Sequence, residues 1–346
     1  SKRPMESAIR CAASELPGFA LFVSLISHRL LKSTYTTIIL PFRGEGKHTP
    51  SGRPVNRKLL ALSGPRNHHA GNPNGGEFFV MTDTPLSNEP VLLRSDADYV
   101  ATLTLNRGAK FNALSRELMS AIQAEIADIV ESADVRVVII AGTGKAFCAG
   151  HDLGEMRADP SSPAMEALFT QCSDMMTSLT KIPQPVIAKV HGMATAAGCQ
   201  LVAQCDLAVT VEDATFATSG VNVGLFCSTP MVAVTRNLSR KQAMEMLLTG
   251  EFIDAETALR YGLVNRVVPA VELDDAVNDL AAMIVNKSPI AIARGKQLFY
   301  EQIDENLDAA YTRATKVITA NMQDEDTRAG IDAFAEKRPM PDWKGK

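Results

Sequence analysis

The chain has 346 residues, 46% of them hydrophobic, and a net charge of −4. This composition is ordinary for a globular protein and argues against a basic nucleic-acid-binding surface, so we expect a small-molecule or protein partner and no nucleic acid. The six cysteines show no CxxC or other metal-ligand spacing, and we therefore expect neither a metal site nor a disulfide framework.

The first 80 residues differ in composition from the rest. They hold eleven of the 35 basic residues but only four of the 39 acidic ones, which leaves 24 basic and 35 acidic residues afterwards and a net charge of −11 there. The apolar run at 19–26 is too short to span a membrane. If 1–80 is an organelle leader, the sequence predicts a mitochondrial matrix protein, and a natural start at Met81 predicts a bacterial-type cytoplasmic one. In both cases we expect most of 1–80 to be disordered.

The next segments have the patterns of an alternating strand, a helix and a buried strand. Residues 99–105 alternate apolar and polar side chains, as a half-buried strand does. Ser115 suits the N-cap of a helix. The apolar residues at helical spacing after it predict a buried face formed by Leu118, Ile122, Ile126 and Ile129. The apolar run 135–142 is typical of a strand in a sheet that is covered on both faces.

The remainder predicts a strand–helix rhythm followed by helices. We expect a helix at 165–181, ended by two prolines, and strands at 186–190, 207–211 and 215–217. After about residue 218 we expect helices only. Their starts are marked by the N-caps Ser239 and Asp254, with two or three further helices over 272–337. This order predicts an α/β core with a helical C-terminal layer.

Two turns rich in small residues lie between the predicted core elements. Residues 142–156 have the sequence GTGKAFCAGHDLGEM, and residues 191–201 have the sequence HGMATAAGCQL. Each turn follows an apolar strand, and the second leads into a helix. Small residues let a backbone approach a ligand closely, and the first N–H groups of a helix have no partner within it. Together the two turns predict a site that holds one oxygen atom of a ligand.

With these turns and the segment 216–230, FATSGVNVGLFCSTP, the chain from about residue 99 to 337 resembles the crotonase, or enoyl-CoA hydratase/isomerase, superfamily. The resemblance implies a spiral core of stacked ββα units over 81–285. It also implies a helical region over 286–346 that serves oligomerisation and covers the site. The implied assembly is a homotrimer or a dimer of trimers.

The resemblance implies that an acyl-CoA thioester is the substrate or ligand, without a further cofactor. Its carbonyl oxygen would lie in an oxyanion hole made by two backbone N–H groups, which by motif are those of His151 and Ala197. Because Ala197 opens a helix, the helix dipole would strengthen its N–H. For the CoA part, the resemblance implies contacts from Lys145, Ala146 and Lys337, the last near the phosphates.

The sequence departs from the family where hydratases carry their two glutamates. The matching positions are Gln200 and Gly220. A glutamine side chain does not accept a proton at neutral pH, and glycine has no side chain. The loss of one such group commonly lowers a rate by roughly 10²–10⁴, so we expect hydratase activity to be weak or absent. The His151 side chain is a candidate replacement acid or base. A structural role is expected for His191, and residues 221–226 are expected to line the acyl pocket.

Three functions are compatible with these residues. The first is an acyl-CoA enzyme that needs enolate stabilisation but not two carboxylates, catalysing isomerisation, decarboxylation or thioester hydrolysis. The second is an acyl-CoA-binding protein that has lost catalysis and acts through binding or assembly. The third is a true hydratase whose acid–base role has moved, with His151 as the candidate. The sequence leaves open the length and branching of the acyl group.

Overall fold

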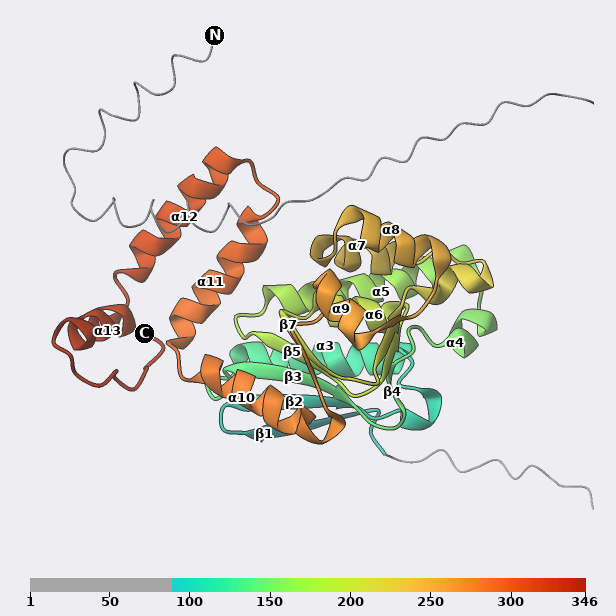
Figure 1. Cartoon of the computed structure of the whole chain (residues 1–346), viewed down its shortest axis with the longest axis horizontal. Coiled ribbons are helices and arrows are strands. Elements are labelled where there is room, and N and C mark those ends of the chain that lie inside the picture. The colour runs from blue at the N-terminus through green and yellow to red at the C-terminus, as the bar shows by residue number, and fades with distance from the viewer. Residues whose placement is uncertain (1–88) are drawn as a thin grey trace, which may run out of the picture. The chain divides into compact units, whose positions relative to one another are not determined.

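The computed structural model describes residues 89–346, which are drawn in colour in Figure 1. The expected disorder of residues 1–80 and the domain boundary at Met81 lie outside the described residues. None of the described helices is long and apolar enough to cross a membrane.

The strands form two sheets. The larger sheet has the order β1 (Leu92–Ala97), β2 (Val100–Leu105), β3 (Val137–Gly142), β5 (Val186–Val190), β7 (Leu207–Val211) and β10 (Arg266–Val268). Only its first pair, β1 and β2, is antiparallel. The smaller sheet has the order β4 (Ala146–Cys148), β6 (Met193–Thr195), β8 (Thr215–Ala217) and β9 (Ile253–Asp254). The strands predicted at 186–190, 207–211 and 215–217 are confirmed.

A repeated connection produces both sheets at once. The chain runs from β3 to β4, from β5 to β6 and from β7 to β8, and each time the first strand joins the larger sheet and the second joins the smaller one. The first pair is followed by α4 (Leu153–Ala158) and α5 (Ser162–Lys181), and the second by α6 (Ala197–Gln204). This stacking of ββα units is the predicted α/β spiral core, and it brings the two turns that follow β3 and β5 to one side of the fold.

The helices cover the larger sheet as the apolar pattern predicts. The first five residues of β3 are buried, so both faces of this strand are covered. Helix α3 (Arg116–Glu131) packs against β1 and β2, while α10 (Leu273–Val285) packs against β3, β5 and β7. The Ser115 side chain accepts a hydrogen bond from the Leu118 N–H, and the predicted apolar face of α3 is buried. The N-cap and the core stripe are therefore confirmed.

The expectation that only helices follow residue 218 is wrong. Two strands, β9 and β10, complete the two sheets there; they are only two and three residues long and are held by pairing with β8 and β7. Four helices, not two or three, occupy 272–337, because polar N-caps at Ser288, Asn306 and Asp324 divide the segment. They are α10, α11 (Pro289–Gln302), α12 (Leu307–Asn321) and α13 (Glu325–Ala335). The remaining elements are η1 (Gly108–Lys110), η2 (Ser219–Val223), α7 (Ser228–Asn237), α8 (Arg240–Thr249), α9 (Ala255–Tyr261) and η3 (Ala270–Glu272).

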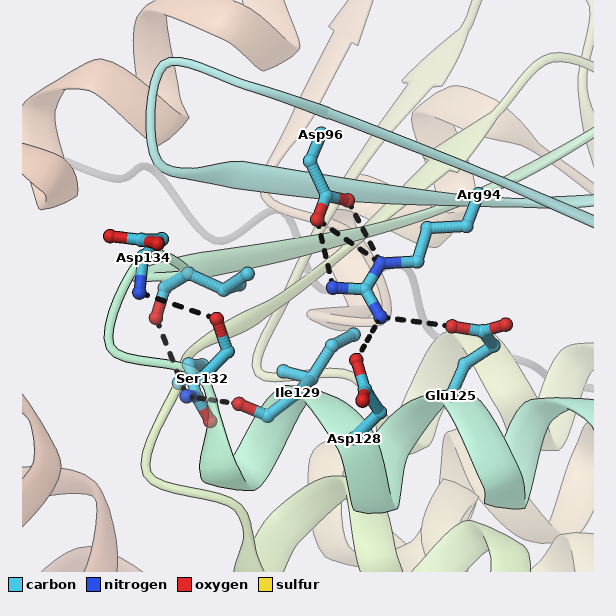
Figure 2. A network of polar contacts seen from close by, with 9 residues as sticks. Arg94, Asp96, Glu125, Asp128, Ile129, Ser132 and Asp134 are labelled. Carbon is cyan, nitrogen blue, oxygen red and sulfur yellow. Dashed lines mark hydrogen bonds and ion pairs between the residues drawn. The ribbon is translucent and has the colours of Figure 1, made fainter.

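The edge strand β1 was not predicted, because its outer residues are polar and exposed. A charge cluster attaches it to α3 (Figure 2). The Arg94 guanidinium lies 2.8 Å from a carboxylate oxygen of Asp96, 3.0 Å from one of Glu125 and 2.5 Å from one of Asp128. These carboxylates, Asp96 foremost, raise the pKa of Arg94. The cluster therefore fixes a strand that has little apolar surface of its own.

A buried ion pair joins α11 to the core. The Lys296 Nζ lies 2.7 Å from a carboxylate oxygen of Asp206, and it donates hydrogen bonds to the carbonyl oxygens of Leu179 and Gln184. The Tyr300 hydroxyl donates to the other carboxylate oxygen of Asp206 at 2.8 Å. Burial lowers the pKa of Lys296, although the charge of Asp206 opposes this. Because Asp206 lies two residues after the end of α6, the pair links the C-terminal helices to this end of α6.

Candidate active site

The two small-residue turns touch each other. Gly150 has φ +90°, and a Cβ built there would lie 2.9 Å from the Ala196 Cβ and 3.1 Å from the Ala197 nitrogen. A Cβ at Gly198 would lie 2.0 Å from the carbonyl oxygen of Cys148. Glycine is therefore required at both positions, for its conformation at Gly150 and for space at Gly198. The packing places the first turn against the N-terminus of α6, as the sequence predicts.

The two predicted donors both keep an unused N–H group. Leu114 and His151 form a β-bridge, but the hydrogen bonds of this bridge do not use the His151 N–H. The Leu114 N–H donates to the Gly150 carbonyl (2.7 Å), and the Leu114 carbonyl accepts from the Asp152 N–H (3.1 Å). The His151 N–H itself donates to no carbonyl among the described residues. Neither does the Ala197 N–H, which as the first residue of α6 has no partner within the helix.

A cavity of about 400 Å³ lies against these two residues. Its wall is formed by residues of the first turn and α4, by Phe169 of α5, by Ala196 and Ala197, and by nine of the twelve residues at 219–230. No aspartate, glutamate, lysine or arginine is among the described residues that line it. The cavity thus suits an apolar group, and three of the residues at 221–226 are part of its wall, namely Val223, Leu225 and Phe226.

Gly220, which the sequence motif predicts to replace one family glutamate, lies on the cavity wall. Its N–H donates to the Cys227 Sγ at 3.3 Å, and its carbonyl accepts from the Leu225 N–H at 3.0 Å. A Cβ at Gly220 would lie 2.3 Å from the Leu225 carbonyl oxygen and 2.9 Å from the Cys227 Sγ. The loop closes on itself here, so this backbone conformation has no room for a glutamate side chain.

Gly220→Ala is expected to destabilise the fold by about 1–3 kcal/mol, because the new methyl group overlaps a backbone oxygen that cannot move without its loop. Gly295→Ala is the matched control, since a Cβ at Gly295 in α11 has open space around it. That change is expected to stabilise the helix by about 0.5–1 kcal/mol. Urea unfolding measures both values; equal effects of the two substitutions would contradict the predicted steric overlap.

Gln200, predicted to replace the other glutamate, lies on α6 and is 4% exposed. Its Oε1 is buried and has no hydrogen-bond partner among the described residues, and Gln200 is not among the residues that line the cavity. An amide cannot take up a proton at neutral pH. Neither position therefore supplies a general base to the cavity.

The His151 side chain lies on the cavity wall in an apolar setting. Its ring meets the Phe169 ring edge to face, with centroids 5.2 Å apart, and its Nε2 is buried without a hydrogen-bond partner among the described residues. Burial lowers the pKa of His151 to about 4. The imidazole is therefore uncharged at neutral pH, which disfavours it as a general acid there.

The burial of His151 predicts a pH dependence of stability. In the unfolded chain a histidine has its ordinary pKa of about 6.5, so between that value and about 4 the unfolded state binds the proton more readily. The part of the free energy of unfolding that depends on uncharged His151 is thus fully present above pH 6.5. Up to about 3 kcal/mol of it is lost as the pH drops to 4. In His151→Leu this part of the loss is expected to disappear.

Urea unfolding of wild type and His151→Leu at several pH values between 7 and 4 measures this difference. His191, whose pKa burial also lowers, keeps part of the slope in both proteins. If the free energies of unfolding of the two proteins changed equally with pH, this would contradict the assignment of the loss to His151.

The His191 Nε2 lies 3.1 Å from the Gly144 carbonyl oxygen, which agrees with the structural role expected for this residue.

Sequence reasoning missed Asn112, which holds the first turn in place. Asn112 is fully buried with φ +52°, and its Nδ2 donates to the carbonyl oxygens of Thr143 and Ala146 at 2.8 Å each. Its Oδ1 accepts from the Arg107 N–H, and the Arg107 guanidinium pairs with Asp152 at 2.8 Å. Although burial opposes the shift, hydrogen bonds from Arg107 and from the backbone lower the pKa of Asp152. No periodic pattern marks a loop asparagine with these contacts.

The three residues predicted to contact CoA lie in different settings. Lys145 is exposed on the first turn. Ala146 is 1% exposed and its carbonyl accepts a hydrogen bond from Asn112, and its contact with CoA stays a prediction. Lys337 is exposed and follows α13, which Figure 1 places at the opposite end of the described residues from α4. None of the described residues that line the cavity comes from these C-terminal helices.

Comparison with known proteins gives consistent matches. The family model described as enoyl-CoA hydratase/isomerase matches residues 96–346. A rat protein, mitochondrial enoyl-CoA hydratase domain-containing protein 3, is 42% identical over 71% of this chain and 82% of its own length. Two solved structures are also similar. An enoyl-CoA hydratase from Mycobacterium smegmatis has 53% identity and a TM-score of 0.72, covering 74% of this chain and 99% of that one. The human enoyl-CoA hydratase domain-containing protein 3 has 41% identity and a TM-score of 0.71, covering 73% and 100%.

Proposed function

The chain belongs to the enoyl-CoA hydratase/isomerase family, and we propose on this basis that it binds an acyl-CoA thioester in the cavity beside α6. The acyl group fills the apolar cavity, and the thioester oxygen accepts hydrogen bonds from the N–H groups of His151 and Ala197. The observation that carries the proposal is the pair of unused N–H groups, which belong to two touching turns at the wall of one apolar cavity.

Two such donors stabilise the negative charge that develops on a thioester oxygen when an enolate forms. Each donor in a preorganised, water-poor site is worth roughly 3–4 kcal/mol in a transition state. The positive end of the α6 dipole adds to the Ala197 donor. The apolar wall strengthens both interactions, because charges interact more strongly where the dielectric constant is low.

The residues that line the cavity limit the reactions that this site could catalyse. Because no carboxylate lines the cavity among the described residues, the chemistry that fits is stabilisation of an oxyanion without a glutamate pair. The oxyanion is an enolate in isomerisation or decarboxylation, and a tetrahedral intermediate in thioester hydrolysis. Binding without catalysis is the alternative. The low pKa of His151 weighs against a hydratase in which this side chain has taken over the acid role. The proposal requires no further cofactor.

We assign Lys145 to the phosphates of CoA, since it is exposed on the turn that carries His151. Lys337 does not line the cavity of its own chain, and we assign it to the cavity of a second copy in a homotrimer or a dimer of trimers. Helix α12 supports such an assembly, because it buries no residue and exposes large apolar side chains, among them Leu307, Tyr311 and Ile318.

The two origins considered for this chain, mitochondrial and bacterial, both occur among the relatives. The rat relative is mitochondrial by its name, and the structure with 53% identity comes from Mycobacterium smegmatis, a bacterium.

Isothermal titration calorimetry with butyryl-CoA and free CoA tests the binding proposal. Butyryl-CoA is expected to bind at least about tenfold more tightly, because each buried CH₂ group contributes about 0.8 kcal/mol. Equal affinities would show that the acyl group does not enter the apolar cavity. If neither butyryl-CoA nor free CoA bound, the proposed function would be overturned.

A further inference from the structure

A second cavity lies at the other edge of the larger sheet. Its volume is about 360 Å³, and its wall includes Val135, which precedes β3, and Pro183, which precedes β5. These two strands are parallel, and the turns of the candidate active site follow their opposite ends. At about 3.3 Å per residue, β3 separates its two ends by roughly 20 Å. The second cavity is therefore distinct from the one beside α6.

Three basic side chains and no acidic one are among the described residues that line this cavity: Arg136, Lys287 and Lys344. We refer to it as the basic cavity. Most of its other lining residues are apolar, among them Ile284 and Ile290. Like charges around one cavity repel one another, and more strongly beside apolar groups, where the dielectric constant is low. An anion in the cavity offsets this repulsion.

The guanidinium of Arg136 is held in place by uncharged partners. It donates to the carbonyl oxygens of Val285 at 3.1 Å and Trp343 at 3.2 Å, and it lies 4.5 Å from the centre of the Tyr99 ring. Two of the five N–H donors of an arginine are thus used, and three remain. The position of this cation is set before a ligand arrives, which reduces the entropy lost on binding.

One buried acid, Asp326, lies close enough for the charge of Arg136 to act on it. Its carboxylate already accepts hydrogen bonds from the Ser288 Oγ at 2.7 Å and from the N–H groups of Lys344 at 2.8 Å and Gly345 at 2.9 Å. Although burial opposes the shift, these bonds and, after them, the charge of Arg136 lower the pKa of Asp326. Asp326 is not among the residues that line the basic cavity.

The two lysines of the basic cavity are accessible and nearly free of acidic partners. Both are exposed, and Lys287 forms no ion pair with another of the described residues. The Lys344 Nζ lies 3.9 Å from a carboxylate oxygen of Glu325, but the two side chains are 71% and 63% exposed. An exposed pair of this kind contributes little. The cavity therefore keeps positive charge that the described acids do not neutralise.

We propose that the basic cavity binds a small carboxylate that carries an alkyl chain. The carboxylate accepts hydrogen bonds from Arg136 and pairs with Lys287 and Lys344, while the chain lies against the apolar part of the wall. The wall joins residues of the core to Lys344 and Gly345 of the C-terminal tail, so the bound anion also ties this tail to the core. The site is independent of the proposed function, because it lies at the other edge of the sheet.

Calorimetry of the full chain with octanoate, 1-octanol and acetate tests the proposal. Octanoate is expected to bind at least about tenfold more tightly than octanol, which lacks the charge, and than acetate, which lacks the chain. Saturating butyryl-CoA is expected to leave the octanoate affinity unchanged, because the two cavities are separate. Equal affinities for octanoate and octanol would overturn the proposal. Displacement of octanoate by butyryl-CoA would place it in the cavity beside α6 and would also overturn it.

Substitution of the lysines identifies the site. Lys287→Met and Lys344→Met change exposed side chains, and each is expected to weaken octanoate binding about three- to tenfold. Lys316→Met in α12 is the matched control, since it removes the same charge from an exposed lysine that does not line the basic cavity. Its affinity for octanoate is expected to equal that of wild type. A loss as large in Lys316→Met as in the other two, or no loss in any variant, would contradict the assignment.

Discussion

Replacement of Ala197 by proline is expected to lower the rate of any enolate-forming reaction of this protein by about 10²–10³. Proline has no N–H, so the variant removes one of the two proposed oxyanion donors and leaves the other. The first position of a helix is the one that accepts proline best, because its N–H has no partner within the helix. The substitution therefore acts on the site more than on the α6 hydrogen bonds.

The direct measurement is the infrared carbonyl stretch of bound butyryl-CoA labelled with ¹³C at the thioester carbon. In wild type the band is expected at lower frequency than in solution, because two hydrogen bonds polarise the carbonyl, and in Ala197→Pro most of that shift is expected to vanish. Arg240→Pro is the matched control, since it places proline at the first position of α8, far along the chain from the turns. An unchanged carbonyl shift in a folded Ala197→Pro variant would show that Ala197 is not a donor.

Replacement of Lys296 by methionine is expected to destabilise the protein by about 3–5 kcal/mol. The change leaves the Asp206 carboxylate partly buried without its cation, and an uncompensated buried charge is strongly unfavourable. It also leaves the carbonyl oxygens of Leu179 and Gln184 without their donor. Because this ion pair attaches α11 to the core, the C-terminal helices are expected to detach first.

Arg313→Met is the control for this prediction. Arg313 also pairs with carboxylates, those of Glu301 and Glu305, but its side chain is 43% exposed. An exposed pair contributes less than about 1 kcal/mol. Urea unfolding of the two variants at pH 7 measures the difference, and a loss of stability in Lys296→Met no larger than in Arg313→Met would mean that the buried pair does not hold α11.

The parts of the fold that the sequence predicts are those set by local pattern. The strand at 186–190 is a buried apolar run, and the helix after Ser115 has a cap and an apolar stripe; both form as expected. The strands that were missed, such as β4 and β6, have three residues each and exist because neighbouring strands pair with them. The edge strand β1 depends on charged contacts with α3 instead of apolar burial.

The candidate site also combines features that local sequence predicts with features that depend on tertiary contacts. Its two turns are predicted because small residues next to buried strands are visible in the sequence. The replacement of two glutamates is predicted because a motif gives their positions. The lack of space at Gly220 depends on the Leu225 carbonyl oxygen, and the charge state of His151 depends on its burial beside Phe169. The role of Asn112 depends on carbonyl groups more than 30 residues away. Only the folded chain brings these atoms together.

The central claim is that the protein holds an acyl-CoA thioester without the carboxylate pair that hydration requires. Hydration of crotonyl-CoA tests it most directly, followed by the loss of the conjugated-thioester absorbance, with a glutamate-bearing hydratase of the family measured in parallel. We expect no turnover above the buffer rate while butyryl-CoA still binds. Turnover comparable to that of the glutamate-bearing enzyme would contradict the account and would require an acid–base group other than Gln200 and Gly220.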